Sequence, residues 1–171
     1  MSRERGGRRE GAGRTASLAV LAAILLAAGA QAALGGGLPP QAGERERCPV
    51  CGMFVAGYPD FLSAVRFRDG GHAWFDGPKD LFRYLLGMRR YAPARRPEDV
   101  EAVFVKDYYS LEFIDGRTAF YAEGSDVYGP MGRELVPFER EKEARQFLRD
   151  HKGRSLYRFG EITAEVLGKL R

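Results

Sequence analysis

The stretch Phe67-Arg68-Asp69-Gly70 recurs further along the chain as Phe113-Ile114-Asp115-Gly116. An Asp-Gly pair between apolar runs is typical of a β-hairpin turn. Each copy is followed by a short aromatic segment, a loop that contains glycine and proline, and an amphipathic helical pattern. The repeat therefore predicts two β-hairpin-plus-helix (ββαβ-like) units.

The segments around the first copy predict two strands and a helix. Residues 61–67 alternate apolar with other side chains, as half-buried strands do. Asp69-Gly70-Gly71 is a turn signal, and we expect residues 72–75 to return as a second strand. Asp76-Gly77-Pro78 then ends the second strand and opens a helix, for which Asp76 is the expected N-cap. Apolar residues at helical spacing mark one face of that helix: Leu81, Phe82, Leu85 and Leu86.

The segments around the second copy predict a similar order. We expect strands over 100–105 and 108–113, a hairpin turn at Asp115-Gly116, and a return strand over 118–122. Residues 123–137 are rich in glycine and proline and predict a loop. A helix over 139–151, a short strand over 156–159 and a helix over 162–170 complete the expected elements. The fold class is therefore α+β with an antiparallel sheet, in two units of about 48–98 and 99–171.

The stretch Cys48-Pro49-Val50-Cys51-Gly52-Met53 contains both cysteines of the protein and one of its four methionines. Soft sulfur ligands suit Cu(I), and thiolates also suit zinc. Gly52 allows the backbone to turn back, so that Met53 approaches Cys51. The stretch predicts a metal site made of Cys48, Cys51 and Met53, although Cys48 could instead be only the disulfide partner of Cys51.

Met131 is the fourth predicted ligand, because a methionine between glycines in Gly129-Pro130-Met131-Gly132 has no obvious core face to occupy. If the two units pack side by side, this loop and the cysteine loop meet at their junction. Met88, His72 and His151 are expected to have structural roles. No pair of carboxylates and no Ser/His/Asp set points to catalysis, so the sequence predicts a binding protein and not an enzyme.

The N-terminus predicts export. Five arginines precede the apolar run at 18–28, and Ala30-Gln31-Ala32 matches the signal-peptidase pattern. We expect a signal peptide over 1–32 and a flexible linker over 33–47, with an uncleaved N-terminal anchor as the alternative. The residues after 32 include 22 basic and 21 acidic side chains. This near-neutral balance gives no reason to expect nucleic-acid binding.

Five stretches together resemble the NosL family of nitrous-oxide-reductase accessory proteins: 48–53, 75–80, 108–109, 124–132 and 135–138. The resemblance spans about residues 48–163. It implies two ββαβ-type units and an exported Cu(I)-binding metallochaperone that is periplasmic or held at the membrane surface. Such a protein helps to supply copper for the maturation of nitrous-oxide reductase in denitrification. Many members of the family are lipoproteins, but no cysteine ends the signal here, so lipid anchoring is not implied.

The resemblance leaves the copper-accepting client open. The client could be nitrous-oxide reductase, another copper enzyme or a copper-transporting membrane complex. Two other classes also stay open. A thiol-disulfide redox protein would use the CxxC pair, but that motif usually opens a helix after a strand. A small zinc module would need four ligands, and the sequence offers only two cysteines and two widely separated histidines.

Overall fold

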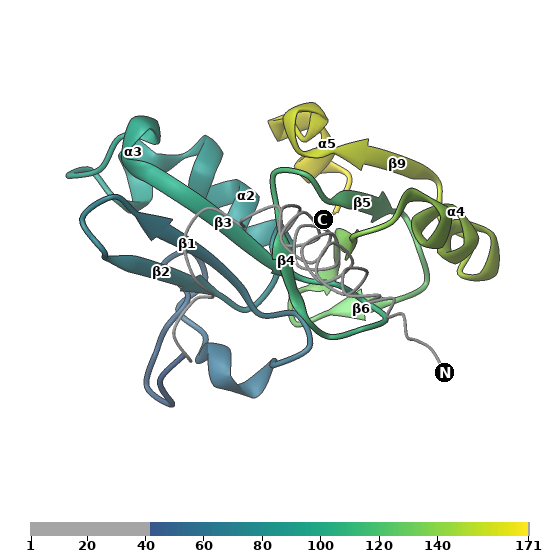
Figure 1. The fold of residues 1–171 in the computed structure, drawn as a ribbon, viewed down its shortest axis with the longest axis horizontal. Helices are drawn as coiled ribbons and strands as arrows, with labels where there is room; N and C mark the ends of the chain where they lie inside the picture. Colours follow the sequence, from purple (N-terminus) through teal and green to yellow (C-terminus); the bar gives the residue numbers. More distant parts are fainter. Residues whose placement is uncertain (1–41, 171) are drawn as a thin grey trace, which may run out of the picture. The chain divides into compact units, whose positions relative to one another are not determined.

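Four antiparallel strands form the first sheet of the computed structural model, which describes residues 42–170 (Figure 1). The strand order is β2-β1-β3-β4, so the two strands of the first hairpin are joined by a third from further along the chain. Helix α2 (Pro78–Leu86) contacts β1 and β2. The strands are β1 (Ser63–Phe67), β2 (His72–Phe75), β3 (Val100–Lys106) and β4 (Phe113–Asp115).

Three antiparallel strands form the second sheet, in the order β8-β5-β9. They are β5 (Phe120–Glu123), β8 (Val136–Phe138) and β9 (Ser155–Arg158). Helix α4 (Glu141–Asp150) contacts all three strands. Its apolar face buries Ala144 and Phe147, at the spacing that one face of a helix requires.

The two sheets repeat one topology. In the first, β1, β2, α2 and β3 follow in the chain and give the strand order β2-β1-β3. In the second, β5, β8, α4 and β9 follow in the same way and give β8-β5-β9. Two ββαβ units in antiparallel sheets confirm the predicted fold class.

The predicted second hairpin is wrong. Asp115-Gly116 does not join two paired strands, because β4 pairs with β3 and β5 enters the other sheet. Gly116 carries the chain across: its N–H donates to the carbonyl of Val103, and the Tyr121 hydroxyl donates to its carbonyl. A Cβ at this position would lie 2.7 Å from Val103 Cγ1. The division between the sheets therefore falls after β4 and not at residues 98–99.

The segment 108–112, expected to be a strand, is a turn. The Asp107 carboxylate accepts hydrogen bonds from the backbone N–H groups of Tyr109, Ser110 and Glu139. Leu111 closes the turn with a positive φ of 58°. An aspartate that binds the backbone ahead of it favours a turn over a strand, whatever the β-propensity of the tyrosines.

The region 123–137, expected to be a loop, contains a small hairpin and the start of β8. The hairpin consists of β6 (Tyr128–Gly129) and β7 (Gly132–Arg133), which pair only with each other. It is inserted between β5 and β8, at the place where the first unit has a tight turn. Shorter elements join the rest: η1 (Val55–Gly57), α3 (Met88–Tyr91), η2 (Pro97–Asp99), η3 (Phe159–Glu161) and α5 (Ala164–Gly168).

Edge-to-face packing links the first helix to the second sheet. The rings of Phe82 on α2 and Tyr121 on β5 lie 5.0 Å apart, and Tyr121 is fully buried. Val166 and Leu167 of α5 join the same core, beside α2. The second, smaller core lies between α4 and its sheet. The contacts of Phe82 and of α5 hold helix α2, whose first turn lies at the candidate site.

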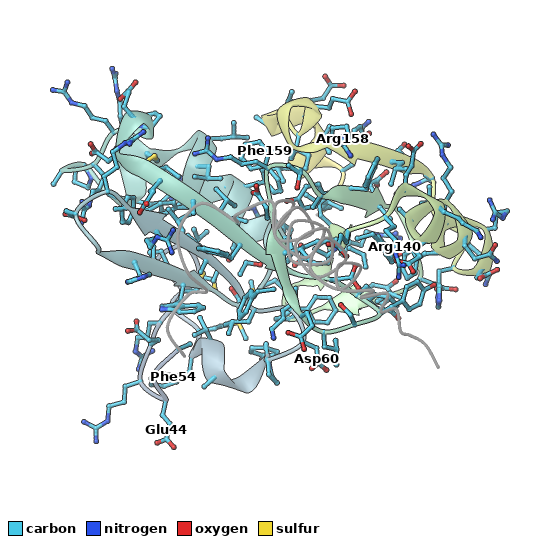
Figure 2. The ribbon with its side chains drawn as sticks, in the orientation of Figure 1. Glu44, Phe54, Asp60, Arg140, Arg158 and Phe159 are labelled. Carbon is cyan, nitrogen blue, oxygen red and sulfur yellow. The ribbon has the colours of Figure 1, made fainter. Side chains whose placement is uncertain are left out.

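No helix within residues 42–170 is long and apolar enough to cross a membrane. The predicted signal peptide over 1–32 and most of the predicted linker lie outside the described residues. The last residue of that linker, Arg47, forms an isolated β-bridge with Phe54, and its guanidinium lies 3.8 Å from the centre of the Phe54 ring. Figure 2 shows Phe54 at the surface, on the loop that follows the cysteines.

Candidate metal centre

A tight turn holds the two cysteines and Met53 together. The N–H of Cys48 donates to the carbonyl of Met53 at 2.9 Å, and the N–H of Gly52 donates to the carbonyl of Cys48 at 2.8 Å. Gly52 has a φ of 79°, which side chains other than glycine rarely adopt. The turn thus depends on Gly52, where the sequence predicted that the backbone turns back.

Each cysteine faces a carboxylate from another part of the chain. Cys48 Sγ lies 3.6 Å from Asp80 Oδ2, and Cys51 Sγ lies 3.4 Å from Asp76 Oδ1. One ligand atom from each of the four residues falls within 4.8 Å of the others. Cys48, Asp76 and Asp80 are buried, whereas Cys51 is half-buried. A cation in this cluster would therefore have access to solvent mainly past Cys51.

The expected N-cap role of Asp76 is wrong. The N-cap of α2 is Gly77, and no side chain of the neighbouring residues caps it. The Asp76 carboxylate is instead turned toward Cys51. A distant residue binds the helix start: Glu134 Oε1 accepts a 2.6 Å hydrogen bond from the N–H of Lys79. Glu134 thus binds a backbone N–H in the first turn of α2, and the Asp76 carboxylate faces Cys51 instead of capping the helix.

Burial keeps both thiols protonated. It raises the pKa of Cys51 to about 11, with a smaller contribution from the negative charge of Asp76. Burial also raises the pKa of the more enclosed Cys48, and further than that of Cys51. Neutral thiols can donate S–H bonds to Asp76 and Asp80. A metal ion would take the place of those protons, because only thiolates bind metals strongly.

The two carboxylates of the cluster differ in their ionic partners. Asp76 and Asp80 are both about 1% exposed, and the guanidinium of Arg83 lies 2.9 Å from Asp80 Oδ1. For Asp76, no ion pair is found among the described residues. A buried carboxylate with no cationic partner is costly unless a bound cation or a donor compensates it.

The predicted ligand Met53 lies in the cysteine turn, with a half-buried side chain. Met131 lies at the tip of the β6–β7 hairpin and is 43% exposed. Its hairpin is held against the start of α2, since Lys79 Nζ donates to the carbonyls of Met131 and Arg133 at 2.6 and 2.7 Å. The structure thus brings the backbone of Met131 to the helix that carries Asp76 and Asp80. Among the described contacts, none joins the Met131 sulfur to the cysteines.

Other candidates lie outside the four-residue cluster. Met88 is 4% exposed and packs in the first core, as expected. His72 is exposed. It lies opposite Arg66 in the register of β1 and β2, at the end of β2 that is remote from Asp76. His151 Nδ1 lies 3.1 Å from Asp126 Oδ1, and its ring stacks on Phe147.

Sequence reasoning missed Asp76 and Asp80 as site residues. They are separated from the cysteines by 25 and 32 positions, and only the turn from β2 into α2 brings them close. A signal was present in Phe75-Asp76-Gly77-Pro78-Lys79-Asp80, where two carboxylates flank a helix start. That stretch predicted helix capping just as well, so only the fold could decide.

The duplicated ββαβ topology and the buried dithiol–dicarboxylate cluster define a small α+β domain with a candidate metal centre. The NosL family model matches residues 39–167, so the chain belongs to the NosL family.

Two relatives illustrate the membership. The copper-binding lipoprotein NosL of Stutzerimonas stutzeri is 29% identical over 125 residues, which are 72% of this chain. The match spans 65% of that relative's length. The crystal structure of the copper chaperone NosL from Shewanella denitrificans matches with a TM-score of 0.63 and 26% identity. It covers 76% of this chain and 98% of the other.

Proposed function

We propose that the protein is an exported Cu(I)-binding accessory protein that delivers copper for the assembly of a copper enzyme, nitrous-oxide reductase or another. The observation that carries the proposal is the pair of Cys48 and Cys51, held in one turn beside Met53. Sulfur is the donor that Cu(I) prefers. The names of the two relatives, a copper-binding lipoprotein and a copper chaperone, support the same metal.

The proposed ligands are Cys48, Cys51, Met53 and Met131. Cys51 is half-buried and would be the entry point, whereas the buried Cys48 would be the inner ligand. The exposed Met131 thioether, a weak and neutral donor, would complete the site from the second unit. Such a site can release copper by ligand exchange, in which the acceptor's ligands replace these sulfurs one at a time.

The redox alternative is disfavoured by the place of the CxxC pair. The pair lies in a turn that leads to the short η1, and α2 begins only at Pro78. Burial also raises the pKa of both thiols, which lowers the fraction of reactive thiolate. A thiol-disulfide redox enzyme needs a lowered thiol pKa and therefore a larger fraction of thiolate.

A zinc module remains the second candidate, and one observation favours it. Asp76 and Asp80 supply the two further ligand atoms that the sequence alone did not offer, within 4.8 Å of both thiols. Two thiolates and two carboxylates are a donor set that zinc accepts. Zinc binding would use the carboxylates, whereas Cu(I) binding would use the thioethers.

An anaerobic titration of the reduced protein with Cu(I), in competition with a chromophoric chelator, tests the proposal. We expect one Cu(I) per chain, lost for the most part in Cys51→Ser and weakened less in Met131→Ala. Met88→Leu and His72→Gln are the controls and should bind like the wild type. X-ray absorption should show sulfur neighbours.

Two results would overturn the proposed site. Unchanged affinity in Met131→Ala together with nitrogen neighbours would exclude the two-loop sulfur site and return attention to His72. Tighter retention of zinc than of Cu(I), abolished by Asp76→Asn with Asp80→Asn, would favour the zinc module instead.

A further inference from the structure

Leu86, the last residue of α2, is 55% exposed, although the same helix buries Leu81 completely. Three hollows of the surface meet at this side chain, since each is lined in part by Leu86. Exposed aliphatic side chains are common when scattered singly. Leu86 differs because of what surrounds it.

Three arginines without an acidic partner surround Leu86. Arg89 and Arg90 are exposed on α3, and Arg96 is exposed just before η2. Within residues 42–170 no ion pair involves any of them, whereas Arg83 and Arg95 are paired with Asp80 and Asp69. Together with Leu86, these three arginines are called the Leu86 surface. They line one open hollow of about 830 Å³, in which Glu98 is the only acidic lining residue.

The fold turns these arginines outward. Gly87 ends α2, and its N–H donates to the carbonyls of Arg83 and Tyr84. Helix α3 then buries Met88 in the core and stacks Tyr91 on Tyr84, with the rings 6.3 Å apart. Because Met88 and Tyr91 face the same side at helical spacing, Arg89 and Arg90 face solvent. Figure 1 shows α3 beside the start of β3, remote from the β6–β7 hairpin.

The positive charge is local. The residues after 32 include 22 basic and 21 acidic side chains, so the chain as a whole is close to neutral there. Three unpaired guanidinium groups on one short segment are therefore not a reflection of general basicity. They favour a partner that carries several negative charges close together.

An apolar cavity of about 350 Å³ opens beside Leu86. Its walls include Phe82, Met88 and Phe159, and Figure 2 labels Phe159. The charged side chain in its lining is Arg117, whose guanidinium donates to the carbonyl of Val100 at 3.1 Å. An apolar hollow with guanidinium groups around it fits a molecule with a hydrocarbon chain and an anionic head.

We propose that the Leu86 surface binds the face of an anionic phospholipid bilayer. The guanidinium groups of Arg89, Arg90 and Arg96 bind lipid phosphates, for which their planar fork of donors is suited. Leu86 enters the interface between head groups and acyl chains. An acidic protein would satisfy the arginines, but it would not account for the exposed leucine and the adjoining apolar cavity as well.

Binding of a bilayer at Leu86 would place the candidate metal centre on the side of the protein that faces water. Asp76 and Asp80 lie at the start of α2, and Leu86 is its last residue. At about 1.5 Å of rise per residue, the nine-residue helix separates its two ends by roughly 13 Å. A bilayer that receives Leu86 would therefore leave the cysteine turn toward water, where a soluble partner can reach it.

The test is co-sedimentation with lipid vesicles, using protein isolated from the envelope of producing cells so that it has its natural N-terminus. Vesicles of phosphatidylcholine are compared with vesicles that also contain phosphatidylglycerol. Anionic lipid would also attract the five arginines of an uncleaved leader, so the Leu86 surface is reported by comparing a charge-reversed variant with a matched control. The variant combines Arg89→Glu, Arg90→Glu and Arg96→Glu. The matched control combines Lys142→Glu, Arg149→Glu and Lys152→Glu, which changes the net charge equally on and after α4.

We expect phosphatidylglycerol to increase binding of the wild type and the control by about a hundredfold at low salt, on the basis of about fivefold for each arginine. The gain should disappear in the arginine variant and at high salt. In Leu86→Trp, tryptophan emission should shift to the blue only with the anionic vesicles. Equal binding to both kinds of vesicle, or equal loss in variant and control, would overturn the proposal. Retention on immobilised polyglutamate without vesicle binding would assign the surface to an acidic protein instead.

Discussion

The ammonium group of Lys79 donates a 2.6 Å hydrogen bond to the carbonyl oxygen of Met131. The side chain is buried, which is rare for lysine, and it joins the first turn of α2 to a hairpin more than fifty residues away. If Met131 is a copper ligand, Lys79 is the residue that positions it.

Lys79→Leu should therefore weaken Cu(I) binding only when Met131 is present. The substitution removes the two hydrogen bonds that Lys79 Nζ donates to backbone carbonyls and should cost about 1–3 kcal/mol of unfolding free energy. In a double-mutant cycle with Met131→Ala, the two losses in copper affinity should not add. Lys106→Leu is the control, because Lys106 Nζ likewise donates to a backbone carbonyl, that of Leu111, in a turn remote from the cysteines in the sequence. Additive losses would show that Lys79 does not act through Met131.

Gly52→Ala should weaken copper binding as well as stability. An alanine at a φ of 79° costs about 1 kcal/mol and would deform the turn that holds Cys48 and Cys51. Gly70→Ala is a matched control, since Gly70 has a φ of 84° in the turn before β2 and open space around it. Denaturation in urea should show similar losses for both variants. A drop in Cu(I) affinity for both, or for neither, would contradict the role of the turn.

Oxidation of the cysteine pair should block the site. Both cysteines are free thiols in the structure, and an oxidising compartment would favour a Cys48–Cys51 disulfide. The reduced protein should bind Cu(I), and the oxidised protein should bind it much more weakly, as measured by the same chelator competition. Equal affinity in the two forms would mean that the thiolates are not the main ligands.

The stability of the protein should fall as the pH rises from about 4.5 to about 8, through one buried carboxyl group. Burial raises the pKa of Glu134 to about 8 from a usual value of 4.5. Between these values the folded state holds a proton that the unfolded state has lost, so the contribution of this group is complete at low pH and lost as the pH rises. Glu134→Gln imitates the protonated form and should remove a slope on the order of a few kcal/mol over this range.

Urea denaturation of the wild type and of Glu134→Gln at several pH values measures that slope. The hydrogen bond from the N–H of Lys79 can still be accepted by a glutamine oxygen. The two proteins should therefore have similar stability at low pH and diverge as the pH rises. Parallel curves over the whole range would show that Glu134 is ionised in the folded protein.

Export remains a prediction from residues outside the described part of the chain. The basic leader and the apolar run at 18–28 should direct the protein across the membrane, and cleavage should follow Ala32. Intact-mass measurement of protein from membrane and periplasmic fractions should show a start near Ala33. A full-length product in the cytosol would contradict export.

The first unit could be predicted closely from the sequence because its signals are local. The alternation in 61–67 and the turn signal before 72–75 predicted two strands, and Pro78 marked the helix start. The repeated Asp-Gly pair predicted two similar units, and the structure contains two. The two Asp-Gly pairs, however, do not occupy equivalent positions in these units. Asp69-Gly70 turns between β1 and β2, whereas Asp115-Gly116 ends β4, an additional strand of the first sheet.

The candidate site could be predicted only in its local part. Cys48, Cys51 and Met53 lie within six residues, so their proximity follows from one turn. The facing carboxylates of Asp76 and Asp80 depend on how β2 passes into α2. The burial of Lys79 and Glu134 depends on a contact between two units. No pattern within either segment predicts the contact between Lys79 and the hairpin or between Glu134 and α2. Lysine and glutamate are usually exposed, so their residue types also favour the opposite prediction.

The β6–β7 hairpin belongs to neither sheet and pairs only with itself. Insertions of this kind can change in length and sequence without disturbing a core. Lys79 binds this hairpin only through the backbone carbonyls of Met131 and Arg133, so the side chain at position 131 can change while the hairpin stays beside α2. If Met131 is a copper ligand, as proposed, then a histidine at its position would change the donor without moving the thiols, and this hairpin would be the part of the fold through which copper retention is adjusted.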